Sequence, residues 1–106
     1  MEICSFIIND TVYKIYNVNK ISGKRTYVGR SNYDDRTIYI EKSNLKDMLL
    51  TLKHELMHVW LYENGFANQQ DGCFSFEEVC ELVAYSNNSI NRIVELYLEE
   101  LTNRKK

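Results

Sequence analysis

His54, Glu55 and His58 form an H-E-x-x-H pattern inside a stretch whose composition is typical of a helix. Because four residues span slightly more than one helical turn, both imidazoles project from one face, about 40° apart around the axis. That spacing lets two nitrogen ligands share one zinc ion, and the glutamate beside the first histidine can act as general base toward a metal-bound water. These are also the only two histidines in the sequence. The pattern predicts a zinc centre with Glu55 as its catalytic residue.

A third zinc ligand has to come from elsewhere, because catalytic zinc usually binds three protein side chains and keeps one position open for water. The second predicted helix offers Glu77, Glu78, Cys80 and Glu81. Helical spacing puts Glu78 at the edge of that helix's apolar face, where it can turn toward the first helix, whereas the other three point away. The competing interpretation is a capping box of Ser75 and Glu78, in which the carboxylate folds back onto the Ser75 backbone N–H. We expect Glu78 to bind the metal.

Four short strands are expected before the helix that carries the histidines. β-Branched and aromatic runs bounded by turn-forming residues predict strands at residues 3–8, 11–18, 26–29 and 37–40. Asn9 and Asp10 suit a tight turn between the first two strands, a second turn is expected at residues 22–24, and the polar stretch 30–36 separates the last two strands. The simplest arrangement is a small, mostly antiparallel sheet.

Two long helices follow the strands. The first spans residues 43–64, with Ser43 or Asn44 as its N-cap and Gly65 placed to end it. Its apolar stripe consists of Leu45, Met48, Leu49, Leu52, Leu56, Val59 and Trp60. Both histidines lie about 130–180° from the centre of this stripe, so they point away from the helix's own packing face. The second helix spans residues 75–102, and a continuous apolar face runs along it through Val79, Leu82, Val83, Ile90, Ile93, Val94, Tyr97 and Leu101.

Composition and charge limit the partners that the chain can have. Residues 1–106 fit one α+β domain, in which a strand-rich part (1–42) precedes the metal helix (43–64) and the second helix (75–102). A formal net charge of −2 argues against nucleic acid, and no apolar run reaches the ~18 residues of a membrane span. The first residues lack the features of a signal peptide, and three scattered cysteines form no disulfide framework, so we expect a cytoplasmic protein.

The segment from His54 to His58, with Glu78 twenty residues after the second histidine, resembles the glutamate-zincin (thermolysin-like) metallopeptidases. The resemblance is closest to the compact ImmA/IrrE-like and phage-encoded members. These also place a short strand (here residues 37–40) before the metal helix, and they carry a Glu-x-x-x-x-x-Ala segment (here beginning at Glu78). The resemblance implies a minimal zincin-like domain, zinc bound by His54, His58 and Glu78, and Glu55 as general base.

Two departures from the larger thermolysin-like enzymes concern the groups around the metal. Those enzymes have an aspartate four residues after the glutamate ligand, where this chain has Leu82, and they stabilise the oxyanion with a later histidine or tyrosine. In the absence of a third histidine, Tyr62, near the histidine face, or Tyr85, on the Glu78 side of its helix, could donate an O–H instead. Packing is the alternative role for both tyrosines.

The function that the motif predicts is zinc-dependent hydrolysis of a peptide bond in a protein substrate. Zinc lowers the pKa of its water toward neutrality, Glu55 takes the proton, and the same carboxylate then protonates the leaving amine. The strand at residues 37–40 could bind an extended peptide by adding it to the sheet edge. By family likeness, the target would be a regulator from a phage or mobile element. The alternatives are a catalytically weak or inactive zinc-stabilised interaction domain, for which a general base at position 55 is unnecessary, and a metal-free adaptor.

Overall fold

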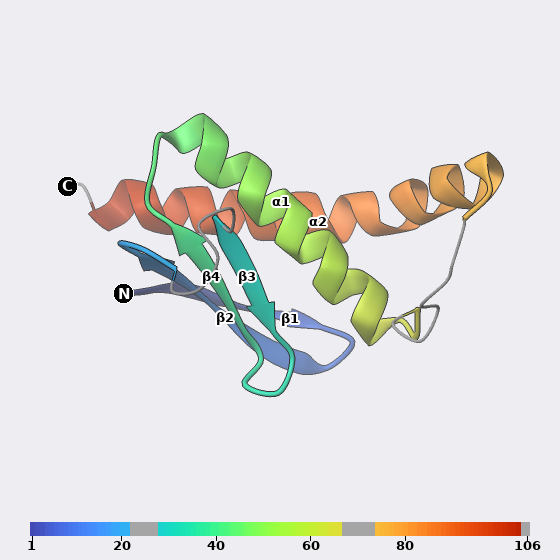
Figure 1. Cartoon of the computed structure of the whole chain (residues 1–106), viewed down its shortest axis with the longest axis horizontal. Coiled ribbons are helices and arrows are strands. Elements are labelled where there is room, and N and C mark those ends of the chain that lie inside the picture. Colours follow the sequence, from blue (N-terminus) through green and yellow to red (C-terminus); the bar gives the residue numbers. More distant parts are fainter. Residues whose placement is uncertain (22–27, 67–73, 105–106) are drawn as a thin grey trace.

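The computed structural model describes residues 1–21, 28–66 and 74–104, in which a four-stranded sheet precedes two helices (Figure 1). The strands are β1 (Glu2–Ile8), β2 (Thr11–Val18), β3 (Gly29–Asn32) and β4 (Thr37–Glu41), and the helices are α1 (Leu45–Glu63) and α2 (Phe76–Arg104). This arrangement confirms the predicted α+β class and the order of its elements. The turn expected at residues 22–24 lies outside the described ranges.

The sheet has the order β1–β2–β4–β3 and is mixed. β1 and β2 form an antiparallel hairpin, and Asn9 and Asp10 both have positive φ angles (49° and 65°), which two-residue turns of this kind require. β2 and β4 are parallel, whereas β4 and β3 are antiparallel. Two of the three pairings are therefore antiparallel, as expected for the sheet as a whole.

The position of β4 contradicts the expectation that residues 37–40 form a sheet edge. β4 lies between β2 and β3, and its two isoleucine side chains are fully buried in the core. The edge on this side of the sheet is β3. It includes residue 29 of the predicted third strand (26–29) but continues to Asn32, past the predicted end, and residues 26 and 27 lie outside the described ranges. β3 uses residues 30–32, which were expected to be a loop. Polar residues are tolerated there because an edge strand is paired on one side and stays partly exposed to water.

One face of the sheet packs against both helices and forms the core. α1 contacts β3 and β4, α2 contacts β1, and the two helices cross each other over the sheet (Figure 1). The completely buried side chains come from both layers: Tyr13, Ile15, Ile38, Ile40, Leu52, Leu56, Val59 and Tyr97. Their removal from water is the main stabilising contribution to the fold. Within the described part of the chain, no helix covers the opposite face of the sheet, where Ile7 and Val12 are exposed.

The bounds of α1 follow from local signals at both ends. The Asn44 side chain accepts a hydrogen bond from the Asp47 backbone N–H (2.9 Å), and Gly65, with a φ of 87°, follows the last turn. Both histidines are exposed on the side that the apolar stripe left free, as predicted. Neither of the helices in the described ranges is both long and apolar enough to cross a membrane.

The apolar face of α2 is only partly buried, which contradicts the continuous packing face expected along residues 75–102. The buried residues of α2 all come from its later turns: Ser86, Ile90, Ile93, Val94 and Tyr97. Nearer the N-terminus, Phe76 is 93% exposed and Val83 is 53% exposed. The helices cross, so the first turns of α2 project beyond the sheet (Figure 1), and the core begins only at Ser86.

Candidate active site

His54 and His58 lie on the exposed face of α1, with their side chains turned toward each other. The two Nε2 atoms are 3.2 Å apart, the ring centroids are 4.8 Å apart, and the ring planes meet at 73°. Two nitrogens bound to one tetrahedral zinc ion, at about 2.0–2.1 Å each, lie about 3.3–3.4 Å apart. The observed separation is therefore close to the one that a shared zinc ion needs.

Glu55 follows the first histidine in the chain, but its side chain is only 7% exposed. Its Oε1 accepts a 2.7 Å hydrogen bond from the Ser31 hydroxyl on β3. An ionised carboxylate loses much of its hydration at such a place, so a charge-assisted hydrogen bond is needed to hold it there. The carboxylate is thus fixed between β3 and the turn of α1 that carries the histidine pair.

Gly29 allows β3 to approach α1 this closely. A Cβ atom at this position would collide with the Thr51 Cγ2 atom and would lie 3.1 Å from Cγ and 3.2 Å from Oε2 of Glu55. Gly29 and Ser31 both face α1, since alternate residues of a strand share a face. Sequence reasoning missed both residues because it placed them at the end of a strand and in a loop. The signal that could have identified them is the alternation of these two small residues with the longer Arg30 and Asn32, which is the two-residue period of a strand.

The histidine face of α1 borders the outer edge of β3. Thr51 and Tyr62 each lie one helical turn from a histidine, so helix geometry puts them beside the pair. Thr51 faces Gly29 on β3. Tyr62 stacks on Tyr33, which follows β3, with the ring centroids 4.2 Å apart and the ring planes within 2°. The residues that flank the histidines on α1 therefore contact β3 and the turn that follows it.

Three tyrosines can be compared as candidates for the O–H donor that was expected near the metal. Tyr62, one of the two expected, is 42% exposed on the histidine side of α1. Tyr33 was not expected. Burial, and then the nearby charge of Glu55, raise the pKa of its hydroxyl, which therefore keeps its proton and can donate. Tyr85 is 75% exposed and lines a cavity together with Trp60. Trp60 lies about 160° around the α1 axis from the second histidine, so this cavity, and Tyr85 with it, is not on the histidine side of α1.

Glu78 makes its contacts at the start of α2. The Ser75 N–H donates to Glu78 Oε1 (2.9 Å), and the Glu78 N–H donates to Ser75 Oγ (3.1 Å). These two bonds are the capping box. The hydrogen bond of the Glu78 carboxylate with the Ser75 backbone, and then its interaction with the Ser75 side chain, lower the pKa of the Glu78 carboxyl. Among the described residues, no group of three or more His, Cys, Asp and Glu side chains could hold a metal ion.

The structure therefore brings together part of the predicted metal site. The two histidine rings meet on α1, and Glu55 lies on the same turn of that helix with its carboxylate held by Ser31 of β3, whereas Glu78 caps its own helix. The other candidates, Glu77, Cys80 and Glu81, are exposed on the same turns of α2. Capping is the role that the structure shows for Glu78, and ligation stays a prediction.

Comparisons of the chain with protein-family models, with curated proteins and with solved structures found no match. The resemblance to the glutamate-zincin metallopeptidases depends on the H-E-x-x-H motif and Glu78, and it stays a prediction. The side-chain geometry around His54, Glu55 and His58 is therefore the basis for the function of this chain.

Proposed function

We propose that the protein is a zinc-dependent endopeptidase in which His54 and His58 bind the metal and Glu55 is the general base. The observation that carries this proposal is the 3.2 Å separation of the two Nε2 atoms next to a buried, hydrogen-bonded carboxylate. Zinc bound there would supply an activated water and polarise the scissile carbonyl. The same separation also fits a hydrogen bond between the two rings, so the buried glutamate beside them in the sequence is what distinguishes this pair from ordinary surface histidines.

Glu55 is held in one orientation, which is what a general base needs. Ser31 donates to Oε1, and Gly29 leaves space beside Oε2. A carboxylate fixed in this way can accept a proton from water in front of the histidines without first reorganising its surroundings. The same carboxyl group can then return the proton to the leaving amine.

The substrate that fits this site is an extended peptide segment of a protein. The Glu41 N–H donates to the Val28 carbonyl (2.9 Å). In an antiparallel pair only every second residue forms such bonds with its neighbour, so the backbone N–H and C=O groups of Gly29 and Ser31 point away from β4, toward the open edge. A peptide strand that pairs with these groups would run alongside the histidine face of α1. β3 thus takes the peptide-binding role that was expected for residues 37–40.

We place this reaction in the cytoplasm, because α2 carries an exposed free thiol, Cys80, which a reducing compartment preserves. By resemblance to the phage-encoded metallopeptidases, the proposed target is a regulatory protein of a phage or mobile element. Nucleic acid is not proposed as a partner, since the chain has a net charge of −2.

Glu78 stays the proposed third ligand, although it lines the same cavity as Trp60 and Tyr85, away from the histidine side of α1, so ligation would require the start of α2 to move toward the histidines. One of its carboxylate oxygens already accepts the Ser75 N–H, so ligation that gives up this bond would weaken zinc binding by the free energy of the cap.

A zinc-stabilised interaction domain with little or no catalysis is the second candidate function. It is favoured by the engaged Glu78 carboxylate, and by the lack of a three-residue ligand group among the residues that the structure describes. In such a domain the metal would contribute to folding, and Glu55 would only join α1 to β3 through Ser31.

Glu55→Gln separates the two functions, because the amide keeps the size of the side chain but cannot act as general base. We expect the wild type and Glu55→Gln to bind zinc with equal affinity, while only the wild type cleaves a proteome-derived peptide library. Glu95→Gln, which changes an exposed carboxylate on α2, is the matched control and should cleave like the wild type. If the zinc-loaded wild type cleaves no peptide, the interaction domain is the better account. If Glu55→Gln cleaves at the wild-type rate, Glu55 is not the base.

A further inference from the structure

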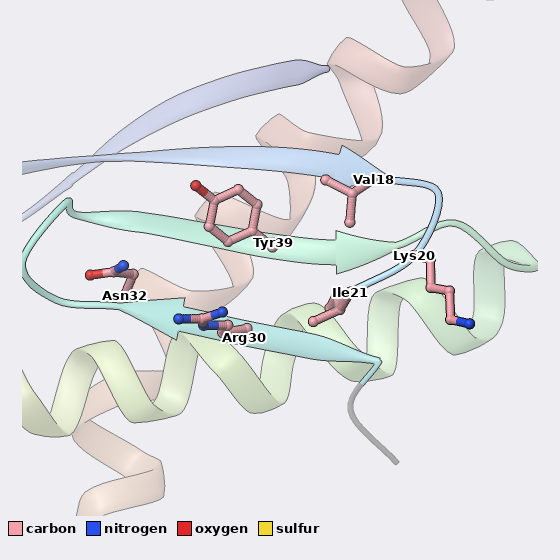
Figure 2. Close-up of a pocket in the computed structure, with 6 residues that line it drawn as sticks. All are labelled: Val18, Lys20, Ile21, Arg30, Asn32 and Tyr39. Carbon is pink, nitrogen blue, oxygen red and sulfur yellow. The ribbon is translucent and has the colours of Figure 1, made fainter. Parts of the chain in front are cut away.

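A cavity of about 280 Å³ opens on the sheet face opposite the helices, near the end of β2 (Figure 2). Its walls are formed by Val18, Lys20, Ile21, Arg30, Asn32 and Tyr39. Figure 2 shows Arg30 and Asn32 on β3, Tyr39 on β4, and Lys20 and Ile21 on the segment after β2. The cavity thus combines an aromatic and aliphatic wall with two cationic side chains.

The two cations of this cavity lack a carboxylate partner in the described part of the chain. Lys20 and Arg30 are both exposed, and neither forms an ion pair with any described residue. Lys14 on β2, in contrast, pairs with Glu2 at 3.8 Å. The positive charge of Lys20 and Arg30 is therefore free to attract an anionic group.

Asn32 and Ile21, which also line the cavity, already use polar groups in hydrogen bonds. The Asn32 amide donates to Asp35 Oδ2 (3.1 Å), and its Oδ1 accepts from the backbone N–H groups of Asp34 and Asp35. Glu41 on β4 uses Oε1 to accept the Ile21 N–H (3.1 Å). Asn32 and Ile21 therefore shape the cavity, and Lys20 and Arg30 are the groups that can bind a ligand.

β3 connects this cavity with the candidate active site. Ser31 faces α1 and binds Glu55, and its neighbour Arg30 faces the cavity, because successive side chains of a strand point to opposite faces. A peptide paired with β3 would follow the same alternation. One of its residues would face the histidines, and the next would lie on the cavity side, about 5 Å from Arg30.

We propose that this cavity selects an acidic side chain of the bound peptide, adjacent to the residue that faces Glu55; this inference rests on the endopeptidase function proposed above. The Arg30 guanidinium can hold a carboxylate through two parallel hydrogen bonds, and Lys20 adds a second positive charge. The methylene groups of a glutamate would pack against Val18 and the Tyr39 ring. The substrate class is therefore a peptide segment with Glu or Asp beside the cleavage site.

A binding experiment on zinc-loaded Glu55→Gln tests this inference without turnover. The probes are two blocked pentapeptides, Thr-Val-Glu-Val-Thr and Thr-Val-Gln-Val-Thr, titrated while the backbone N–H signals of residues 30 and 31 are followed by NMR. We expect the glutamate peptide to bind about fivefold to tenfold more tightly. Adding Arg30→Gln or Lys20→Gln should reduce this preference, whereas Lys14→Gln, which changes a cation outside the cavity, should leave it unchanged.

Three results would overturn the inference: equal affinity for both peptides, a preference that persists in both cavity variants, or no binding of either peptide at millimolar concentration. A single-stranded oligonucleotide that shifts the Arg30 signal more strongly than the glutamate peptide would also overturn it. Cleavage without any acidic preference would refute this inference and leave the endopeptidase standing. If the wild type prefers the glutamate peptide but never cleaves a peptide, the endopeptidase function is refuted and the acidic-side-chain site stands.

Discussion

Replacing Ser31 by alanine removes the hydroxyl that donates to Glu55 and leaves the backbone pairing of β3 in place. The hydrogen bond is short, at 2.7 Å between Ser31 Oγ and Glu55 Oε1, and Glu55 is 7% exposed, so water can replace the lost donor only in part. Hydrogen bonds to charged groups contribute about 1.5–3 kcal/mol. We expect the free energy of unfolding at pH 7 to fall by about 2 kcal/mol, which lowers the melting temperature by on the order of 10 °C in a domain of this size.

Urea unfolding followed by circular dichroism measures this loss, and two further variants show whether Glu55 is its cause. Ser5→Ala removes an exposed serine from β1 and should change stability by less than about 0.5 kcal/mol. In the Glu55→Gln background, Ser31→Ala should cost only about 0.5–1.5 kcal/mol, because both partners are then neutral. An equal loss in both backgrounds, or a loss for Ser31→Ala no larger than that for Ser5→Ala, would refute the reasoning.

Three further predictions concern Gly29 and the start of α2. Gly29→Ala should destabilise the fold by about 1–3 kcal/mol in urea unfolding, because the new Cβ would collide with Thr51; a neutral or stabilising effect would contradict the close β3–α1 contact. The hydrogen bonds from Ser75 lower the pKa of Glu78, so the cap stabilises the fold above the ordinary glutamate pKa of 4.5, and this contribution is lost as the pH falls through the lowered value. Melting curves between pH 7 and pH 3 should therefore show a smaller acid-induced loss in Glu78→Gln than in the wild type, and an identical loss would count against the cap. If Glu78 binds zinc, Glu78→Gln should weaken zinc binding, whereas Ser75→Ala, which keeps the backbone N–H that the Glu78 carboxylate accepts, should leave it nearly unchanged; equal zinc affinity in the wild type and Glu78→Gln would exclude ligation by Glu78.

The elements with regular periodicity could be predicted from the sequence, and those shaped by tertiary contacts could not. The Asn9–Asp10 turn and the Asn44 cap are local signals, and the strands and the helix next to them begin and end close to the expected residues. β3 was missed because its residues have low strand propensity and form a strand through pairing with β4. The exposure of the first turns of α2 was missed because an amphipathic pattern does not show how far the partner helix extends.

The candidate site could be predicted only where one helix carries it. The spacing of the two histidines within α1 determines their relation, which the structure shows as a 3.2 Å contact. The environment of Glu55 depends on Ser31, a residue 24 positions away on another element, and no local pattern connects the two. Glu78 had two roles open, and capping is the one observed, because its partners lie within the same helical turn, whereas ligation requires a tertiary contact.

The most direct test of the central claim is the zinc affinity of the wild type and of its histidine variants, measured by competition with a chromogenic chelator and checked by elemental analysis. We expect stoichiometric zinc in the wild type and in Lys53→Ala, an exposed neighbour on α1, and at least a tenfold to hundredfold loss of affinity in His54→Ala and in His58→Ala. Zinc affinity that is the same in the wild type and in both histidine variants, or a wild type that binds no zinc, would contradict the account.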